Sequence, residues 1–192
     1  MQYEKAYLFL IRKLEAELPS WLTYHNVQHT IDVVKSAQYL ATEEGVKGKD
    51  YLLLSTAAAF HDVGFTEGYN GHEQLSCNIA QKALPAFGYS DAEIKVICEL
   101  IMVTKIPQLP TNQLGEILCD ADLLYLGTDQ YAPIAENLFN EFEKKGIVKD
   151  RDDWNEKQYS FFKAHRFFTS RAIEKYAQKK EENMQKFIRP PV

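Results

Sequence analysis

Histidine and aspartate residues occur in this chain in a combination that can bind a divalent metal ion. His61 and Asp62 are adjacent, and they follow an apolar segment over residues 51–60. Burying an imidazole beside a carboxylate is costly unless a metal ion or hydrogen-bonded partners compensate for the lost hydration. The dipeptide alone leaves both explanations open, and the other histidines and carboxylates decide between them.

Three more histidines lie close to this pair in the sequence. His25 and His29 are four positions apart, so both imidazoles face one side of a helix that includes both residues. His72 stands eleven positions after His61, where the next helix is expected to begin. Four of the five histidines therefore fall early in the chain and next to expected helix ends.

Two carboxylates, Asp120 and Asp122, interrupt the otherwise apolar segment EILCDADLLYL. Unpaired carboxylates are rarely buried, so this segment indicates that at least one of the two has a partner. Imidazoles and carboxylates together suit a hard-to-borderline divalent ion that keeps positions open for water. Such an ion lowers the pKa of its bound water from about 15.7 to about 7 and polarises a phosphoryl oxygen. The residue types therefore predict a hydrolytic metal centre.

The elements that would position these residues are all helices. Apolar residues recur at helical spacing over about 3–18, 27–44, 49–61, 72–87, 91–105, 114–126 and 129–145, and two more helices fall between 154 and 187. Asn26 and Thr128 are expected N-caps, and Ser90 with Glu93 forms a capping box. Alternation typical of strands is not found. We predict a single all-helical domain over residues 1–192.

Length, charge and cysteine content narrow the class of protein. A chain of 192 residues that is 45% hydrophobic suits one globular domain. The net charge of −5 gives no basic field for nucleic acid or anionic membranes, so neither is expected as a partner. Three widely spaced cysteines predict neither disulfides nor a cysteine zinc site. With a charged N-terminal segment and no long apolar stretch, a cytoplasmic location is expected.

The order His29, His61-Asp62 and Asp122 resembles the H…HD…D signature of the HD-domain superfamily of metal-dependent phosphohydrolases. The resemblance covers about residues 24–127 and extends to the strings FHDVGF, HEQLS and DADLLYLG. It implies a helical bundle of the HD-domain or phosphodiesterase-like type, followed by C-terminal helices over about 128–189. It also implies that the four residues bind a divalent ion (Mn, Mg, Fe, Co, Ni or Zn), with Asp120 beside them rather than among the ligands.

A second, local resemblance concerns the general acid. YHNVQHTIDV is similar to a string of the class I cyclic nucleotide phosphodiesterases, which share this metal core. The similarity implies that His25 protonates the leaving alkoxide, a task that suits an imidazole with a pKa near 6.5. The rest of that signature is missing, so the similarity does not carry over a substrate.

Two further residues are expected at the rim of the site. Superfamily members that bind two metal ions supply extra histidines, and His72 could be one of them, a phosphate contact, or only a helix cap. The helix that ends near Lys105 offers no histidine, so a second protein-bound ion is not expected. Lys105 could meet a substrate phosphate as a point charge.

The resemblance implies hydrolysis of a phosphomonoester or phosphodiester of a small molecule, such as a nucleotide or cyclic nucleotide. In such a reaction we expect Asp62 or a neighbouring residue to orient the attacking water. Two alternatives stay open: a module that senses nucleotides without turnover, and a di-iron oxygenase. The aromatic residues between 159 and 168 are expected in the core or on a homodimer surface.

Overall fold

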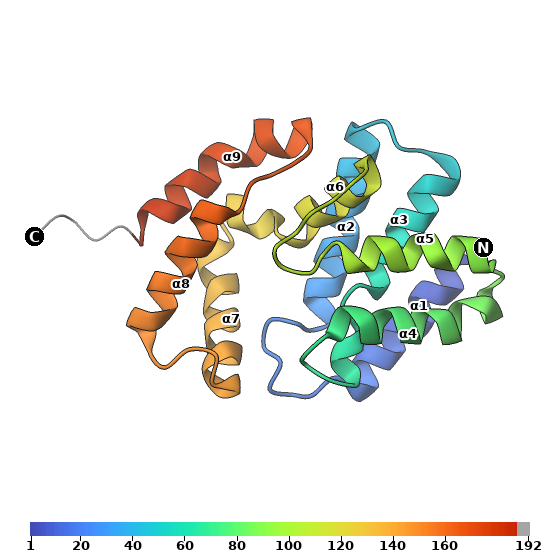
Figure 1. The fold of residues 1–192 in the computed structure, drawn as a ribbon, viewed down its shortest axis with the longest axis horizontal. Coiled ribbons are helices and arrows are strands. Elements are labelled where there is room, and N and C mark those ends of the chain that lie inside the picture. The colour runs from blue at the N-terminus through green and yellow to red at the C-terminus, as the bar shows by residue number, and fades with distance from the viewer. Residues whose placement is uncertain (188–192) are drawn as a thin grey trace, which may run out of the picture.

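The computed structural model describes residues 1–187, and every regular element within them is a helix (Figure 1). The α-helices of this part of the chain are α1 (Tyr3–Glu17), α2 (Val27–Glu43), α3 (Gly48–Phe60), α4 (His72–Ala83), α5 (Asp91–Met102), α6 (Gln113–Asp122), α7 (Tyr131–Lys145), α8 (Arg151–Ala164) and α9 (Ser170–Gln185). Short 3-10 helices are η1 (Val63–Thr66), η2 (Leu84–Phe87) and η3 (Leu124–Gly127). The predicted all-helical fold class is confirmed. None of these helices combines the length and apolar character that a membrane crossing needs.

Two helix starts follow from capping residues that the sequence predicted. Asn26 precedes α2, and its Oδ1 accepts hydrogen bonds from the backbone N–H of Gln28 at 2.8 Å and of His29 at 3.1 Å. Ser90 and Glu93 form the expected capping box of α5, in which each side chain accepts a bond from the other residue's backbone N–H. Both caps satisfy donors that a helix start otherwise leaves unpaired, which fixes where α2 and α5 begin.

The single helix expected over residues 114–126 is wrong at its C-terminal end. α6 ends at Asp122, and the chain continues as η3 to Gly127. At this point α9 packs against η3, and a Cβ on Gly127 would lie only 2.5 Å from the backbone oxygen of Tyr176. The bare backbone of Gly127 therefore admits α9, and the chain turns more tightly here than an α-helix does.

Other boundaries also differ from the expected ones. Thr128 is not the N-cap of α7: Gln130 takes that position, and the Thr128 hydroxyl donates to the carbonyl of Tyr125 at 3.0 Å. α8 begins earlier than expected because the side chain of Asp150 caps it. Of the C-terminal helical region expected to reach residue 189, residues 188–189 lie outside the described part of the chain.

Buried apolar side chains form two clusters. The first lies among α1 to α6 and includes Leu54, Phe60 and Ile101, all fully buried. The second lies among η3, α7 and α8 and includes Trp154 and Phe162. In Figure 1 these two groups of helices stand side by side, and α9 contacts both α2 and α8. The predicted ligand residues lie near the junction of the two groups.

Candidate metal centre

Three ligand-type side chains come together where α2, α3 and α6 meet. His29 lies in the first turn of α2, His61 directly follows α3, and Asp122 is the last residue of α6. One nitrogen or oxygen atom of each residue lies within 4.8 Å of the others, so the three could bind one metal ion. α2 packs against both α3 and α6, which brings together residues from distant parts of the sequence.

Asp62 joins this cluster through one carboxylate oxygen. Its Oδ2 lies 3.1 Å from Nε2 of His61 and 3.3 Å from Nε2 of His29. Oδ1 of Asp122 lies 3.5 Å and 3.4 Å from the same two nitrogens. Two imidazole nitrogens and two carboxylate oxygens therefore converge on one small volume.

The hydrogen bonding of these atoms is incomplete in a way that a metal ion would complete. Nε2 of His29, Nε2 of His61 and Oδ2 of Asp62 are buried and form no hydrogen bond within residues 1–187. Nδ1 of His61 donates to the carbonyl of Ala58 at 2.8 Å, so in the neutral ring the lone pair of Nε2 faces the carboxylates. Buried lone pairs repel one another unless a cation lies between them. The residues therefore fit a divalent ion.

The cluster also shifts the pKa values of its members toward their charged forms. Burial alone would lower the pKa of His61, but the carboxylates of Asp62 and Asp122 raise it well above its usual value. Burial alone would raise the pKa of Asp62, but the imidazoles of His61 and His29 lower it well below its usual value. The cluster attracts positive charge, either as protons or as a metal ion.

Gln108, in the loop between α5 and α6, holds Asp122 by its other oxygen. Its Nε2 donates to Oδ2 of Asp122 at 3.1 Å, and the Gln108 side chain is buried. Because Oδ2 is engaged, Oδ1 is the oxygen presented to His29 and His61. No sequence pattern pointed to Gln108, since a lone amide between two loop prolines has many ordinary roles.

Asp120 is not part of the cluster. Its carboxylate accepts hydrogen bonds from the backbone N–H of Phe168 at 2.9 Å, and from the backbone N–H and the hydroxyl of Thr169 at 2.8 Å and 2.7 Å. Burial raises the pKa of Asp120 to about 6, although these bonds oppose the shift. Asp120 therefore anchors the segment before α9 to α6.

His72 reaches the cluster through the glycine of the HDVG string. A Cβ on Gly64 would lie 2.0 Å from the backbone oxygen of His72, so only glycine lets α4 approach this closely. Nε2 of His72 consequently lies 3.4 Å from Oδ1 of Asp62. The ring of Phe65 stacks on His72 at 4.0 Å and on His25 at 4.3 Å, and the two imidazole rings lie 6.2 Å apart.

A buried carboxylate fixes the orientation of His25. Oε1 of Glu141, on α7, lies 2.5 Å from Nδ1 of His25, and Oε2 accepts the backbone N–H of Tyr24 and of His25, each at 3.1 Å. Glu141 is fully buried. Burial raises its pKa, but the hydrogen bonds and charge of His25 bring it below the usual value. One sequence signal could have revealed Glu141. It stands three positions after Leu138, on the buried face of α7, where an acidic residue needs a partner.

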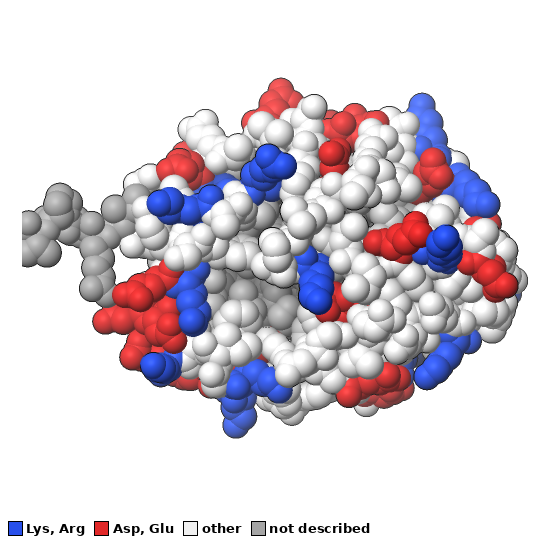
Figure 2. Space-filling model, viewed as in Figure 1, with Lys and Arg blue, Asp and Glu red and all other residues white. Residues whose placement is uncertain are grey.

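A cavity of about 460 Å³ opens above the cluster and lies between the two groups of helices. The predicted residues that line it are His25, Asp62, His72, Lys105 and Asp122. Lys105 has no ion-pair partner within residues 1–187 and is free to meet an anion. The face drawn in Figure 2 is hollowed between these groups, with basic side chains on both sides of the hollow.

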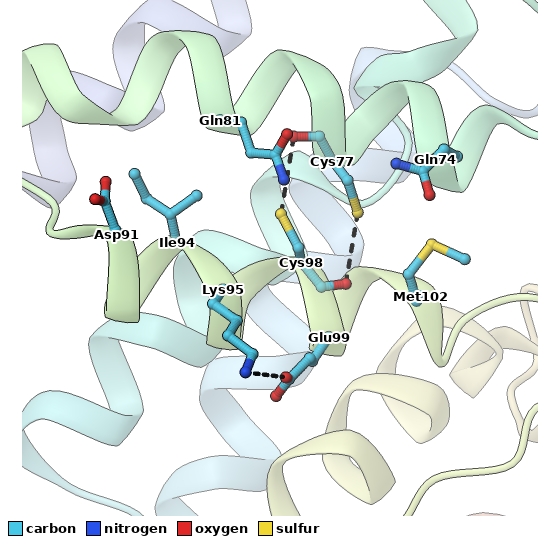
Figure 3. Close-up of a pocket in the computed structure, with 9 residues that line it drawn as sticks. All are labelled: Gln74, Cys77, Gln81, Asp91, Ile94, Lys95, Cys98, Glu99 and Met102. Carbon is cyan, nitrogen blue, oxygen red and sulfur yellow. Dashed lines mark hydrogen bonds and ion pairs between the residues drawn. The ribbon is translucent and has the colours of Figure 1, made fainter.

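A second groove, of about 680 Å³, lies between α4 and α5 and holds none of the predicted site residues (Figure 3). Sγ of Cys77 donates to the carbonyl of Cys98 at 3.5 Å, and Sγ of Cys98 to that of Cys77 at 3.8 Å. Burial raises the pKa of Cys77 to about 12, so its thiol stays neutral. These cysteines and Cys119 are free thiols, as expected.

Comparison with known proteins agrees with the geometry. The HD domain family matches residues 26–126, just over half of the chain. An uncharacterized protein of Clostridium beijerinckii is 32% identical over 97 residues, which cover 49% of this chain and 61% of that protein. No solved structure matches. His29, His61, Asp62 and Asp122 lie inside the matched segment, whereas Glu141 lies beyond it. The chain belongs to the HD domain family.

Proposed function

We propose that this chain is a metal-dependent phosphohydrolase that cleaves a phosphomonoester or phosphodiester bond of a small molecule, such as a nucleotide or cyclic nucleotide. Proteins with an HD domain are typically enzymes of this class. One observation carries the proposal: buried, unpartnered atoms of His29, His61 and Asp62 converge beside a cavity that His25 and Lys105 also line. The cavity has the size of a small-molecule site.

His29, His61, Asp62 and Asp122 would hold the divalent ion, which could be Mn, Mg, Fe, Co, Ni or Zn. When bound, such an ion acts as a Lewis acid on a phosphoryl oxygen and makes a water ligand acidic. Oδ1 of Asp62 is turned away from the histidine pair toward His72, so this oxygen can accept a proton from the attacking water.

His25 is the proposed proton donor to the leaving oxygen. Nδ1 of His25 is hydrogen-bonded to the carboxylate of Glu141, so Nε2 is the nitrogen that remains for the substrate. Phe65 packs against one face of the ring and limits its rotation. A proton held in a fixed position at the cavity wall is what protonation of an alkoxide requires.

Lys105 and His72 would bind the phosphate. Both line the cavity beside Asp62. A lysine in this place offers a positive charge without fixed geometry, and an imidazole offers a directed N–H. Together they would neutralise the substrate charge that the metal site leaves unbalanced.

The test is release of phosphate from a panel of phosphomonoesters and of nucleoside monophosphate from cyclic nucleotides, with each candidate ion added in turn. We expect turnover by the wild type and none above background by Asp62→Ala. Asp129→Asn is a matched control, because that carboxylate is 84% exposed and lies outside the cavity. Equal release by wild type and Asp62→Ala across the panel would refute the proposal.

Two other outcomes would favour the alternatives. Stabilisation by nucleotides with no turnover under any ion would indicate a sensing module. Two iron ions per purified chain would indicate a di-iron oxygenase.

A further inference from the structure

The groove between α4 and α5 brings together three sulfur-containing side chains. Cys77 of α4 and Cys98 and Met102 of α5 all line it. Figure 3 shows the three sulfur atoms directed into the space between the two helices. Cys98 and Met102 are four positions apart, so their side chains lie on the same face of α5. This groove shares no lining residue with the cavity at the candidate metal centre.

The two thiols lie side by side although 21 positions separate them in the sequence. Sγ of Cys77 donates to the carbonyl of Cys98 at 3.5 Å, and Sγ of Cys98 donates to the carbonyl of Cys77 at 3.8 Å. Each sulfur thus reaches the backbone of the other cysteine. Cys77 is 2% exposed, whereas Cys98 is partly exposed. The pair therefore has one buried end and one end that is open to the groove.

These thiols keep their protons when nothing is bound. Burial raises the pKa of Cys77 to about 12. Burial also raises the pKa of Cys98, although hydrogen bonds with the side chains of Cys77 and Gln81 oppose this shift. A neutral thiol is a poor nucleophile and only a weak hydrogen-bond donor. A cation with high affinity for sulfur would displace these protons at little cost in lost hydrogen bonds.

The ligand types in the groove select the kind of ion. Thiolate and thioether sulfur are soft ligands and favour Cu(I), whereas a structural zinc site takes four cysteine or histidine ligands. The carboxylate of Glu99 pairs with Lys95 at 3.9 Å, and Figure 3 shows this pair turned away from the thiols. Asp91 lies at the far end of the groove in the same view. Sulfur atoms alone therefore converge, which suits a soft ion with few ligands.

We propose that Cys77, Cys98 and Met102 form a binding site for Cu(I), separate from the candidate metal centre. The two thiolates are the principal ligands, and the thioether covers the ion from the open side. Met102 is 36% exposed and has a flexible side chain, so its sulfur can move onto the ion. Binding releases both thiol protons to solvent and transfers no electron. The occupied site carries one negative charge, which the partial exposure of Cys98 lets solvent stabilise.

The experiment is a competition for Cu(I) between the full chain and the coloured chelator bicinchoninate. The protein is first reduced and freed of metal, and the titration is carried out without oxygen. We expect the chain to remove one Cu(I) per molecule from the chelator. The complex should also show the ultraviolet charge-transfer absorption of copper bound to thiolate.

Substitution of either cysteine should remove most of this affinity. Cys77→Ser and Cys98→Ser should each weaken Cu(I) binding by more than about 100-fold, beyond the loss expected when only the partner behind a ligand is removed. Met102→Leu should have a smaller effect, because the thioether carries no charge. Cys98 is partly exposed, so Cys98→Ser still tests the site if Cys77→Ser does not fold.

Three control variants should bind Cu(I) as the wild type does. Cys119→Ser removes a buried thiol of α6 that donates to the carbonyl of Val103 at 3.3 Å, outside the groove. Met184→Leu is the matched control for Met102→Leu, because Met184 lies on α9. Asp122→Asn alters the candidate metal centre and leaves all three sulfur atoms in place.

The outcomes are independent of phosphate release. The inference is overturned if the wild type takes no Cu(I) from the chelator, or if the two cysteine variants bind it as tightly as the wild type. It is also overturned if Asp122→Asn loses as much affinity as Cys98→Ser. A Cys77–Cys98 disulfide that forms in air, with no Cu(I) uptake by the reduced chain, would indicate a redox pair instead. Cu(I) binding that depends on both cysteines supports the inference even if no substrate is hydrolysed.

Discussion

Glu141 and His25 are joined across 116 positions of sequence, with Oε1 of the carboxylate 2.5 Å from Nδ1 of the imidazole. The same carboxylate accepts the backbone N–H groups of Tyr24 and His25, just before α2. Glu141 therefore fixes both the proposed general acid and the chain segment that carries it, and α7 takes part in the site although it lies outside the family match.

Replacing Glu141 with Gln should lower kcat more than it changes KM. The amide keeps the shape of the side chain. It removes the negative charge of the Glu141 carboxylate, which interacts with the His25 ring and with the two backbone N–H groups. General acids typically contribute about 100- to 10,000-fold, so His25→Asn should lose at least about 100-fold and Glu141→Gln about 10-fold. Steady-state kinetics tests this prediction.

Glu143→Gln is the control for this pair, since Glu143 lies on the same helix but is exposed. A Glu141→Gln enzyme with unchanged kcat would show that the pairing with His25 is structural only.

Removal of one ligand should reduce metal binding without unfolding the chain. Asp122→Asn leaves a neutral oxygen where the histidine nitrogens need a negative charge. Metal content after dialysis, measured by mass spectrometry, should fall relative to wild type. A saturating ion at about 100 times its Kd should stabilise the wild type by about 2.7 kcal/mol, and the variant should lose most of this. Equal metal content in both proteins would contradict the proposed ligand set.

Gln108→Leu should weaken metal binding about 10-fold, because loss of the partner behind a ligand typically costs about 10- to 100-fold in affinity. Without the bond to Oδ2, the carboxylate of Asp122 is free to rotate away from His29 and His61. Competition with a fluorescent chelator measures the change. Gln113→Leu, at an exposed amide that bonds only a backbone carbonyl, should leave the affinity unaltered.

His165 should make the protein less stable in mild acid. Burial and the nearby charge of Lys180 lower its pKa to about 3, although Asp122 opposes this. In the unfolded chain the pKa returns to about 6.5, so between these values the unfolded state binds more protons. The stabilising contribution is complete above pH 6.5 and is lost as the pH falls toward 3. The loss between pH 7 and pH 5 should be about 2 kcal/mol.

Urea unfolding at both pH values, in wild type and His165→Gln with metal removed, measures this contribution. Between pH 7 and pH 5 the free energy of unfolding should fall by about 2 kcal/mol less in the variant than in the wild type. Identical pH dependence in the two proteins would mean that folding does not lower the pKa of His165.

The fold and the metal cluster were predictable for the same reason. Helical periodicity and capping residues such as Asn26 determine helices through residues only a few positions apart. His61 and Asp62 are polar residues at the end of a segment expected to be buried, and this too is visible in the local sequence. Glu141 and Gln108 could not be predicted because each matters only through a partner from another element. The end of α6 was wrong because the packing of α9 on Gly127, which is not visible in the local pattern, sets it. The roles of His25, His72 and Lys105 stay predictions.

The division of the cavity between two groups of helices has an evolutionary consequence. Under the proposed function, substitutions at the residues of α8 that line the cavity would change which molecule is accepted, while the proposed acid and metal ligands and their supports on or beside α2, α3, α6 and α7 stay intact. A lineage of such enzymes would then acquire a new substrate without passing through an inactive ancestor. Relatives that share the HD segment need not share a substrate, and the sequence of α8 is the place to look for the divergence.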